Sequence, residues 1–156
     1  MPDTGTSTFR SLVAGGAGFI GSHLCDALLS HGHSVVCVDN LMTGRLINIQ
    51  PHLANRRFEF LHHDVTEPLP PSAGNFTHVF HLASPASPPG YQRNPIGTLR
   101  ANSEGTRHLI DLARRDGARF LYASTSEAYG DPLEHPQSES YRGNVSSTGP
   151  RSMYDE

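Results

Sequence analysis

The 156-residue sequence predicts an α/β fold in which helices cover both faces of a parallel sheet. Short apolar runs, typical of buried strands, alternate along the chain with stretches of helical pattern. The first run, at residues 11–14, passes directly into closely spaced glycines, and a helical stretch follows at once. Right-handed crossovers between such strands produce a doubly wound sheet of the Rossmann type, so we expect the strand order 3-2-1-4-5.

The predicted elements follow one another in a regular alternation. Strands are expected at residues 11–14, 35–38, 58–61, 79–82 and 120–123, and helices at 19–30, around 46–53 and at 96–115. The proline-rich stretches 68–71 and 85–89 are interpreted as loops. From Gly130 onward the composition is typical of loops, and another helix is expected to begin near Tyr154. In this topology ligands bind outside the carboxyl ends of the strands, between strands one and four.

Three glycines follow the first strand at the spacing of a dinucleotide-binding turn. Gly15, Gly18 and Gly21 form the pattern GxxGxxG, which removes Cβ atoms where the backbone must approach a phosphate closely. The following helix directs its N-terminal N–H groups and positive dipole end at the anion. This predicts a pyrophosphate site, with Phe19 and Ile20 in the first helical turn beside it. An ordinary strand-to-helix turn is the alternative interpretation.

A carboxylate follows the second strand where a dinucleotide site needs one. Asp39 lies roughly 20 residues beyond the glycines and could accept both ribose hydroxyls of the adenosine half. It would repel a 2′-phosphate, so NAD is favoured over NADP as the cofactor. Asn40 and Thr43, in the loop that follows, are included in the predicted cofactor site. Arg45 is close enough to weaken this preference, although a solvated loop arginine is the favoured interpretation.

Charge and hydropathy exclude several classes of partner. The formal net charge is −3 and no basic run occurs, so neither nucleic acid nor an anionic membrane is expected as a partner. No apolar stretch approaches the ~20 residues of a membrane span, and residues 1–9 lack the apolar segment of a signal peptide. We therefore expect a flexible N-terminus at 1–9, a single domain at 10–156 and a cytoplasmic location.

The cysteines and histidines do not form a metal pattern. Cys25 and Cys37 fall on the predicted first helix and second strand, where we expect small buried thiols. His62 and His63 are adjacent, but neighbouring residues on a strand face opposite ways and could not share one ion without a bend. No metal site is expected.

Small and polar residues follow the third, fourth and fifth strands. Asp64 and Val65 could flank an adenine, although a strand cap explains them equally well. The fourth strand is closed by the small segment Leu82, Ala83 and Ser84, and the fifth by the polar segment Ser124, Thr125, Ser126 and Glu127. The polar segment would lie beside a nicotinamide; a hydrogen-bonded turn is its alternative interpretation. Tyr154 is a phenol of pKa about 10, a poor base unless a neighbouring cation stabilises the phenolate.

Together these segments resemble the UDP-glucuronate decarboxylases, also called UDP-xylose synthases. These are extended short-chain dehydrogenase/reductases of the NAD-dependent epimerase/dehydratase family. The resemblance runs from about Arg10 to the last residue and rests on GGAGFIG at 15–21, HDVTEP at 63–68, HLASPASP at 81–88, STSEAYGDP at 124–132 and GPRSMYDE at 149–156.

The resemblance implies a UDP-glucuronate substrate and an NAD-dependent reaction. Tyr154 would remove the proton of the sugar C4 hydroxyl during oxidation, and Thr125 would hydrogen-bond the same oxygen. Loss of CO2 from the 4-keto sugar and return of hydride would give UDP-xylose. Ser126 and Glu127 match residues that assist decarboxylation and protonation. Arg100 stands where the family usually has a lysine near the substrate, and guanidinium differs from ammonium in reach and geometry.

One departure bears directly on activity. Family members carry a lysine four residues after the motif tyrosine, which here would be position 158, beyond Glu156. We therefore expect residues 10–156 to be an incomplete NAD-binding domain without its C-terminal substrate domain, inactive as an isolated chain. The alternatives are another sugar-nucleotide epimerase or 4,6-dehydratase and a catalytically inactive dinucleotide-binding module. A homodimer is also possible.

Overall fold

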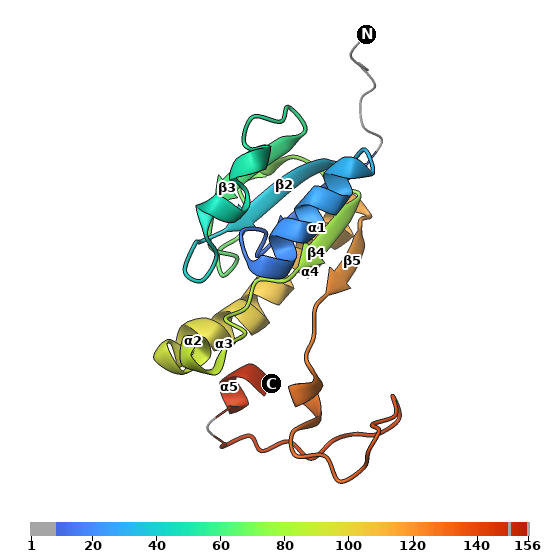
Figure 1. The fold of residues 1–156 in the computed structure, drawn as a ribbon. Helices are drawn as coiled ribbons and strands as arrows, with labels where there is room; N and C mark the ends of the chain where they lie inside the picture. Colours follow the sequence, from blue (N-terminus) through green and yellow to red (C-terminus); the bar gives the residue numbers. More distant parts are fainter. Residues whose placement is uncertain (1–8, 150, 156) are drawn as a thin grey trace.

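A computed structural model describes residues 9–149 and 151–155 (Figure 1). Its centre is a five-stranded sheet in the order β3-β2-β1-β4-β5, with every pairing parallel, which confirms the predicted order. The strands are β1 (Arg10–Ala14), β2 (Ser34–Asp39), β3 (Phe58–His62), β4 (His78–His81) and β5 (Arg119–Tyr122). Each lies within one residue of its predicted bounds.

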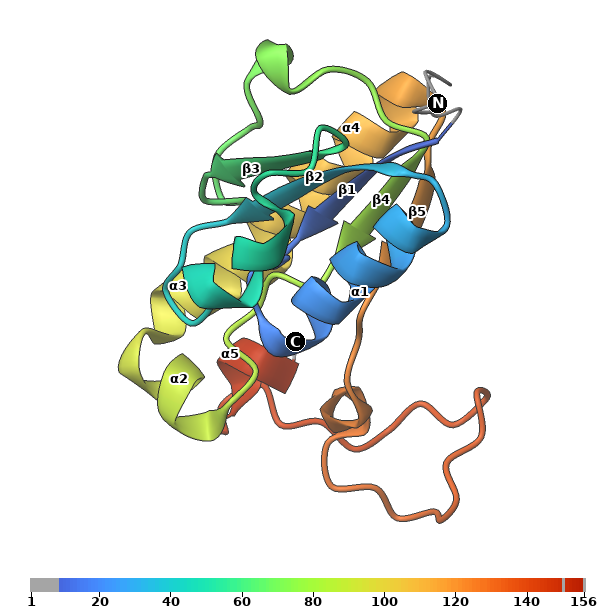
Figure 2. The same cartoon turned by 45° about the horizontal axis from the view of Figure 1, so that its top comes forward.

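Helices cover the two faces of the sheet, as Figure 2 shows for α1 and α4. On one face α1 (Phe19–Ser30) contributes three buried side chains, Cys25, Leu28 and Leu29. On the other, α4 (Thr106–Asp116) contributes Leu109, Leu112 and Ala113. Both clusters pack on alternate residues of the valine-rich central strands, as expected for a sheet buried on both faces.

The two cysteines are free and buried in the cluster under α1, as predicted. A hydrogen bond with the thiol of Cys25, together with burial, raises the pKa of Cys37. Cys37 therefore stays protonated, and both cysteines act as small core side chains.

The helix predicted at 96–115 is interrupted. It consists of α3 (Pro95–Arg100), the π-helical turn η4 (Ala101–Gly105) and α4. The π-turn packs closely against the loop after β3, since a Cβ on Gly105 would come within 2.8 Å of Val65 Cγ2. The hydroxyl of Thr106 donates to the carbonyl of Asn102 across the turn, 2.5 Å away. Such one-residue widenings occur frequently at functional sites.

The prediction of loops at the proline-rich stretches was partly wrong. Helix α2 (Pro88–Arg93) begins within the second stretch, because a proline in the first helical turn has no N–H to leave unpaired. The first stretch ends in a 3-10 turn, η3 (Pro71–Ala73). The short helix expected around 46–53 is a pair of 3-10 turns, η1 (Leu46–Asn48) and η2 (Gln50–His52).

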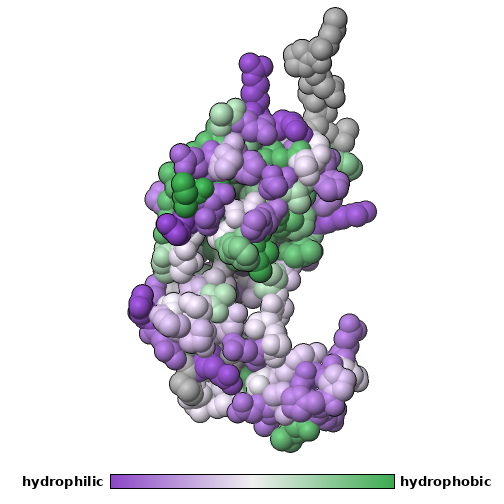
Figure 3. All heavy atoms as spheres, in the orientation of Figure 1, coloured by the Kyte–Doolittle hydropathy of each residue, from purple (hydrophilic) through white to green (hydrophobic). Residues whose placement is uncertain are grey.

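After β5 the chain extends away from the sheet and then turns back towards α3 (Figure 1). The segment includes the 3-10 turn η5 (Ser126–Tyr129), is mostly irregular and ends in α5 (Ser152–Asp155). Helix α5 lies against α3 and η5, and Figure 3 shows a hollow between this segment and the body of the sheet. A helix beginning near Tyr154 was predicted and is present. The predicted flexible N-terminus falls, apart from Phe9, outside the described residues.

Candidate functional site

The three glycines of the first turn meet different surroundings. Gly15 has φ +80°, and a Cβ there would lie 2.7 Å from the Leu82 carbonyl. A Cβ on Gly21 would overlap the Gly15 carbonyl oxygen. Gly18 is different, since its only close neighbour would be that same oxygen, at 3.2 Å. The packing of the protein therefore requires Gly15 and Gly21, whereas Gly18 borders open space through which a ligand could approach the backbone.

The N-terminus of α1 opens directly from this turn. Gly18 is its N-cap residue, and within the described chain no side chain caps the helix and no acidic residue occupies its first turn. The side chains of Phe19 and Ile20 are 78% and 66% exposed. The free N–H groups and the dipole of the first turn favour an anion at this point.

Asp39 binds the glycine turn to the loop after β2. Its buried carboxylate accepts from the Ala17 amide at 2.9 Å and from the Leu41 amide at 2.8 Å. A Cβ on Gly44 would press on the same carboxylate at 2.7 Å. A carboxylate has about four acceptor positions, so two protein donors leave capacity for ribose hydroxyls. Hydrogen bonding to ribose stays a prediction.

Asp64 holds the neighbouring loop. It accepts from the Asn40 side-chain amide and from the Thr66 backbone, both at 2.9 Å. Burial opposes ionisation of Asp64, but the hydrogen bonds from Thr66 and Asn40 outweigh it and lower the pKa. Asp64 therefore makes the local hydrogen bonds of the strand-cap interpretation. A role beside adenine stays a prediction, as does the role of the exposed Thr43 in the loop after β2.

Two buried polar atoms beside these loops have no hydrogen-bond partner among the described residues. They are Ser84 Oγ, just after β4, and Asn102 Oδ1, in the π-turn η4. Buried polar groups of folded proteins are nearly always paired, so each such atom needs an explanation. A polar ligand bound along the glycine turn would explain both atoms by hydrogen-bonding to them. NAD fits this combination of a glycine cradle, a free helix N-terminus and unpaired oxygens.

Asn102 was not predicted from the sequence. It belongs to no glycine, carboxylate or hydroxyl motif, and its unpaired state appears only when the helix is packed on the sheet. Ser84 was predicted, because small residues that close the fourth strand lie at the ligand edge of such a fold.

The segment after β5, which carries the residues predicted to be catalytic and ends in α5, lies at the lower end of the molecule in Figure 2. Thr125 caps η5, its hydroxyl accepting from the Glu127 amide at 3.2 Å, so the hydrogen-bonded turn exists. Tyr154 on α5 stacks on Tyr91 of α2, with ring centroids 4.9 Å apart and an interplanar angle of 15°. The return of α5 brings Tyr154 to the same region as Thr125, Ser126 and Glu127. Tyr91 was not predicted, because only tertiary packing pairs the two rings.

Arginines supply all the fixed positive charge here, since the chain contains no lysine. Arg151 pairs with Glu127 at 3.9 Å and with Asp131 at 3.5 Å. Arg100 lies elsewhere, on α3, with its guanidinium 2.9 Å from Glu104. The hydrogen bond with Glu104 raises the pKa of Arg100. Its predicted contact with substrate stays a prediction.

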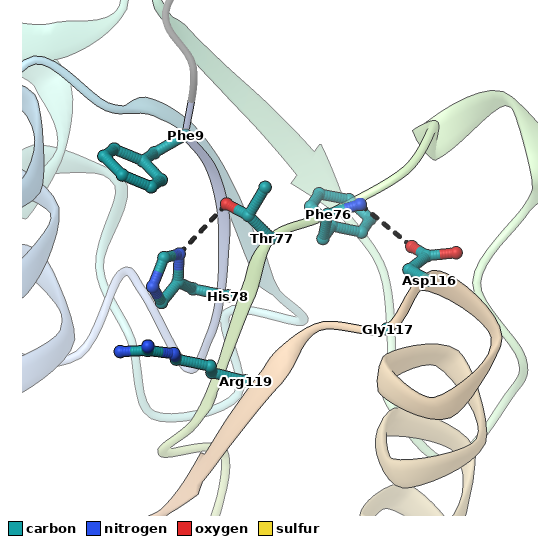
Figure 4. A pocket seen from close by; sticks show the side chains of 7 residues that line it. All are labelled: Phe9, Phe76, Thr77, His78, Asp116, Gly117 and Arg119. Atoms are coloured by element: carbon teal, nitrogen blue, oxygen red, sulfur yellow. Dashed lines mark hydrogen bonds between the residues drawn. The ribbon is translucent and has the colours of Figure 1, made fainter.

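The pocket in Figure 4 lies away from all these residues, at the amino ends of the strands. It has a volume of about 350 Å³ and is lined by Phe9, Phe76, Thr77, His78, Asp116, Gly117 and Arg119. Over the residues that the structure describes, no three His, Cys, Asp or Glu side chains are grouped as metal ligands. No helix in that part of the chain is long and apolar enough to cross a membrane.

Comparison with known proteins agrees with this geometry. The sequence model of the NAD dependent epimerase/dehydratase family matches residues 11–156. The chain belongs to this family. It is 54% identical over 147 residues to UDP-glucuronic acid decarboxylase 1 of Xenopus tropicalis, covering 94% of this chain and 34% of that protein. It is 51% identical over 151 residues to UDP-glucuronic acid decarboxylase 6 of Arabidopsis thaliana, covering 96% of this chain and 43% of that protein.

Solved structures of the family share the fold. A UDP-galactose 4-epimerase superposes with a TM-score of 0.75 at 33% identity, over 94% of this chain and 46% of that one. The UDP-glucose 4-epimerase of Brucella ovis, in complex with NAD, gives a TM-score of 0.76 at 27% identity, over 95% and 45%. The resemblance to UDP-glucuronate decarboxylases is therefore confirmed, and the chain spans about a third of the length of the first curated relatives it matches.

Proposed function

We propose that residues 10–156 form the NAD-binding portion of a decarboxylase that converts UDP-glucuronate to UDP-xylose. One observation carries the cofactor part of the proposal. The open side of Gly18 and the uncapped N-terminus of α1 follow β1, and the unpaired oxygen of Ser84 follows β4, the strand paired with β1. The unpaired oxygen of Asn102 belongs to η4, which is hydrogen-bonded to the end of β4 through Thr106 and His81. The 54% identity to a UDP-glucuronic acid decarboxylase supports the substrate.

The predicted cofactor residues divide between the parts of the dinucleotide in this proposal. The first turn of α1 binds the pyrophosphate, Asp39 binds the adenosine ribose, and the loop of Asp64 and Val65 borders the adenine. NAD, when bound, supplies reversible oxidation at C4 of the sugar. Leu82 and Ala83 allow the cofactor to lie against the backbone at the end of β4.

The second set of residues handles protons on the sugar. Tyr154 accepts the proton of the C4 hydroxyl while Thr125 donates a hydrogen bond to the same oxygen. Once C4 is a ketone, the electrons released by loss of CO2 are held as an enolate through that carbonyl. Ser126 and Glu127 assist this loss and the reprotonation of the sugar carbon. A positioned acid or base of this kind contributes typically about 10²–10⁴-fold to the rate.

Tyr154 needs a cation for this task, because phenol gives up its proton at a pKa of about 10. The nearby candidate is Arg151, and its guanidinium is engaged by Glu127 and Asp131. We therefore propose that residues 1–156 alone bind cofactor without turnover, and that activity needs a lysine four positions after Tyr154 and a substrate domain.

Two preparations test the proposal. The 156-residue chain is titrated with NAD by calorimetry, then incubated with NAD and UDP-glucuronate while CO2 and nucleotide sugars are followed. The second preparation joins residues 1–156 to the remaining C-terminal part of the Xenopus tropicalis relative. We expect NAD binding by both, and CO2 with UDP-xylose from the fusion only.

The products also separate the alternatives. An epimerase would return an isomer of the UDP-sugar with no CO2, and the similarity to solved UDP-sugar 4-epimerases makes this the second candidate. An inactive binding module would bind NAD and leave the fusion inactive. Turnover by the isolated chain at the rate of an intact relative would refute the proposed requirement for a lysine four positions after Tyr154.

A further inference from the structure

His81 is a buried imidazole that the proposed reaction does not use. It is the last residue of β4, where the candidate cofactor residues begin, and only 1% of it is exposed. It shares the α4 face of the sheet with Val79, since alternate residues of a strand point the same way. A polar ring buried so deeply must be hydrogen-bonded, and its partners define its role.

Both ring nitrogens are engaged in one directed chain. The Ala83 amide donates to Nδ1 at 3.3 Å, and Nε2 lies 3.0 Å from Thr106 Oγ1. An amide N–H can only donate, so Nδ1 carries the lone pair and Nε2 carries the proton. Nε2 holds the single ring proton, which it directs at the Thr106 hydroxyl and at the neighbouring Ala101 carbonyl, and the Thr106 hydroxyl itself donates to the Asn102 carbonyl.

The environment keeps this ring neutral. Burial lowers the pKa of His81 to about 4, although a hydrogen bond to the Ala101 carbonyl acts in the opposite direction. A protonated ring would carry a second N–H, at Nδ1, aimed at the N–H of Ala83. The directed chain thus requires the neutral ring, and the neutral ring is the form present near pH 7.

The chain joins the two elements that carry the unpaired oxygens. On one side the Ala83 amide immediately precedes Ser84, whose Oγ has no partner among the described residues. On the other side Thr106 fixes the carbonyl of Asn102, whose Oδ1 is likewise unpaired. Gly15 packs on the same Leu82–Ala83 backbone, since a Cβ added at Gly15 would lie within 2.8 Å of the Leu82 carbonyl and of the Ala83 nitrogen.

We propose that His81 is a positioning residue of the cofactor site. Its imidazole sets the spacing between the carboxyl end of β4 and the π-turn η4, so that Ser84 Oγ and Asn102 Oδ1 face one bound dinucleotide. This inference rests on the proposed cofactor function. His81 does not itself contact the ligand and acts through Ala83 and Thr106.

Four variants of the 156-residue chain test the inference. Thr106→Val removes the hydroxyl at nearly constant shape, and Thr106→Ser restores it. His81→Asn keeps an acceptor near the Nδ1 position but loses the Nε2 donor, and the fourth variant combines His81→Asn with Thr106→Val. NAD affinity is measured by calorimetry well below each melting temperature, and the tautomer of His81 in the wild type by ¹⁵N NMR.

We expect the Nε2-protonated tautomer in the wild type. Thr106→Val and His81→Asn should each weaken NAD binding roughly tenfold, about 1.4 kcal/mol. Thr106→Ser should stay within about twofold, and the double variant should bind no more weakly than either single one, because both break one chain.

Other results would overturn the inference. Folded Thr106→Val and His81→Asn chains with wild-type affinity would show that the hydrogen bonds are structural only. An Nδ1-protonated tautomer would contradict the donor order, and this measurement needs no variant to fold. A folded wild type that fails to bind NAD would refute the proposed cofactor function, and this inference with it. Binding by the wild type with no loss in the variants would refute the inference alone.

Discussion

The two ends of the parallel sheet differ in how their polar groups are hydrogen-bonded. At the amino end the His33 ring is hydrogen-bonded to Ser11 at 2.8 Å and the His78 ring to Thr77 at 2.9 Å. At the carboxyl end, Ser84 Oγ and Asn102 Oδ1 are buried without partners among the described residues. The amino end holds the pocket of Figure 4, whereas the carboxyl end holds these two unpaired oxygens.

The comparison shows that a hollow alone is weak evidence for a binding site. Around the amino-end pocket, Asp116 accepts from the Phe76 amide and pairs with Arg115, so the lining carboxylate is already satisfied. The unpaired Nε of Arg10 lies near this end, but its Nη2 donates to Glu59 and to the Ala73 carbonyl. Unsatisfied buried oxygens at the carboxyl end are the stronger indication of function.

The largest effect expected at the carboxyl end is structural. Gly21→Ala places a Cβ on the Gly15 carbonyl oxygen, so α1 must move away from the sheet. We expect the free energy of unfolding in urea to fall by about 3 kcal/mol or more. Gly149→Ala is the control, since its Cβ would meet nothing closer than 3.4 Å. An unfolding midpoint equal to that of the wild type would show that the turn can accommodate a Cβ at position 21 without loss of stability.

The neighbouring glycine should separate binding from folding. The Cβ of Gly18→Val would meet only the Gly15 carbonyl oxygen, at 3.2 Å, and the side chain is expected to occupy the space beside the helix N-terminus. We expect NAD affinity to fall at least about 100-fold, or ~3 kcal/mol, with the far-UV circular dichroism nearly unchanged. Calorimetry and circular dichroism on the same sample check this. If Gly18→Val binds NAD as tightly as the wild type, the glycine turn is only a structural connection between β1 and α1.

A pH titration of stability should show the contribution of His81 at the carboxyl end. The pKa of His81 is about 4 when folded and about 6.5 when unfolded, so between these values the unfolded chain binds more protons. We expect His81 stabilisation to be complete above pH 6.5 and lost as the pH falls to about 4, a change of roughly 3 kcal/mol.

His33 at the amino end acts in the same direction. Burial and the neighbouring His78 and His31 lower its pKa. Urea unfolding at several pH values, compared between wild type and His81→Asn, isolates the His81 part. An unchanged pH slope in His81→Asn would assign the dependence to other groups, His33 among them.

A smaller effect is expected for cofactor choice. Because Asp39 opposes a 2′-phosphate, NAD should bind about tenfold more tightly than NADP, or ~1.4 kcal/mol. Asp39→Asn keeps one acceptor for the Ala17 or Leu41 amide and should reduce this preference, with a smaller loss of NAD affinity than Gly18→Val. Calorimetric titration of both cofactors decides, and equal affinities in the wild type would remove this role from Asp39.

The smallest effect is expected at the amino end. His78→Asn retains a polar group near the position that contacts the Thr77 hydroxyl, and it lies at the opposite end of β4 from His81. NAD affinity should stay within about twofold of the wild type, a change below ~0.5 kcal/mol. The same titration is the control for His81→Asn. A loss as large as that of His81→Asn would erase the distinction between the two ends.

Local sequence patterns determined the sheet and the position of the glycine turn. Strand apolarity and the glycine spacing are properties of neighbouring residues, so they predicted the strand order and α1 at 19–30, which match the structure. Prolines and the π-turn were less predictable, because their conformation depends on what packs against them. Gly105, for example, lies against Val65, 40 residues earlier in the chain.

Only the tertiary structure decided which polar groups are satisfied. The sequence placed Asp39, Ser84 and Thr125 at strand ends, but not the amides that Asp39 accepts or the absence of a partner for Ser84. Asn102 has no local signature, and the motif that begins at His81 does not reveal its hydrogen bonds, since the state of both residues depends on a helix and a strand that meet through folding. Hydrogen-bond satisfaction is a property of three-dimensional neighbours, whereas strand and helix patterns arise from residues a few positions apart.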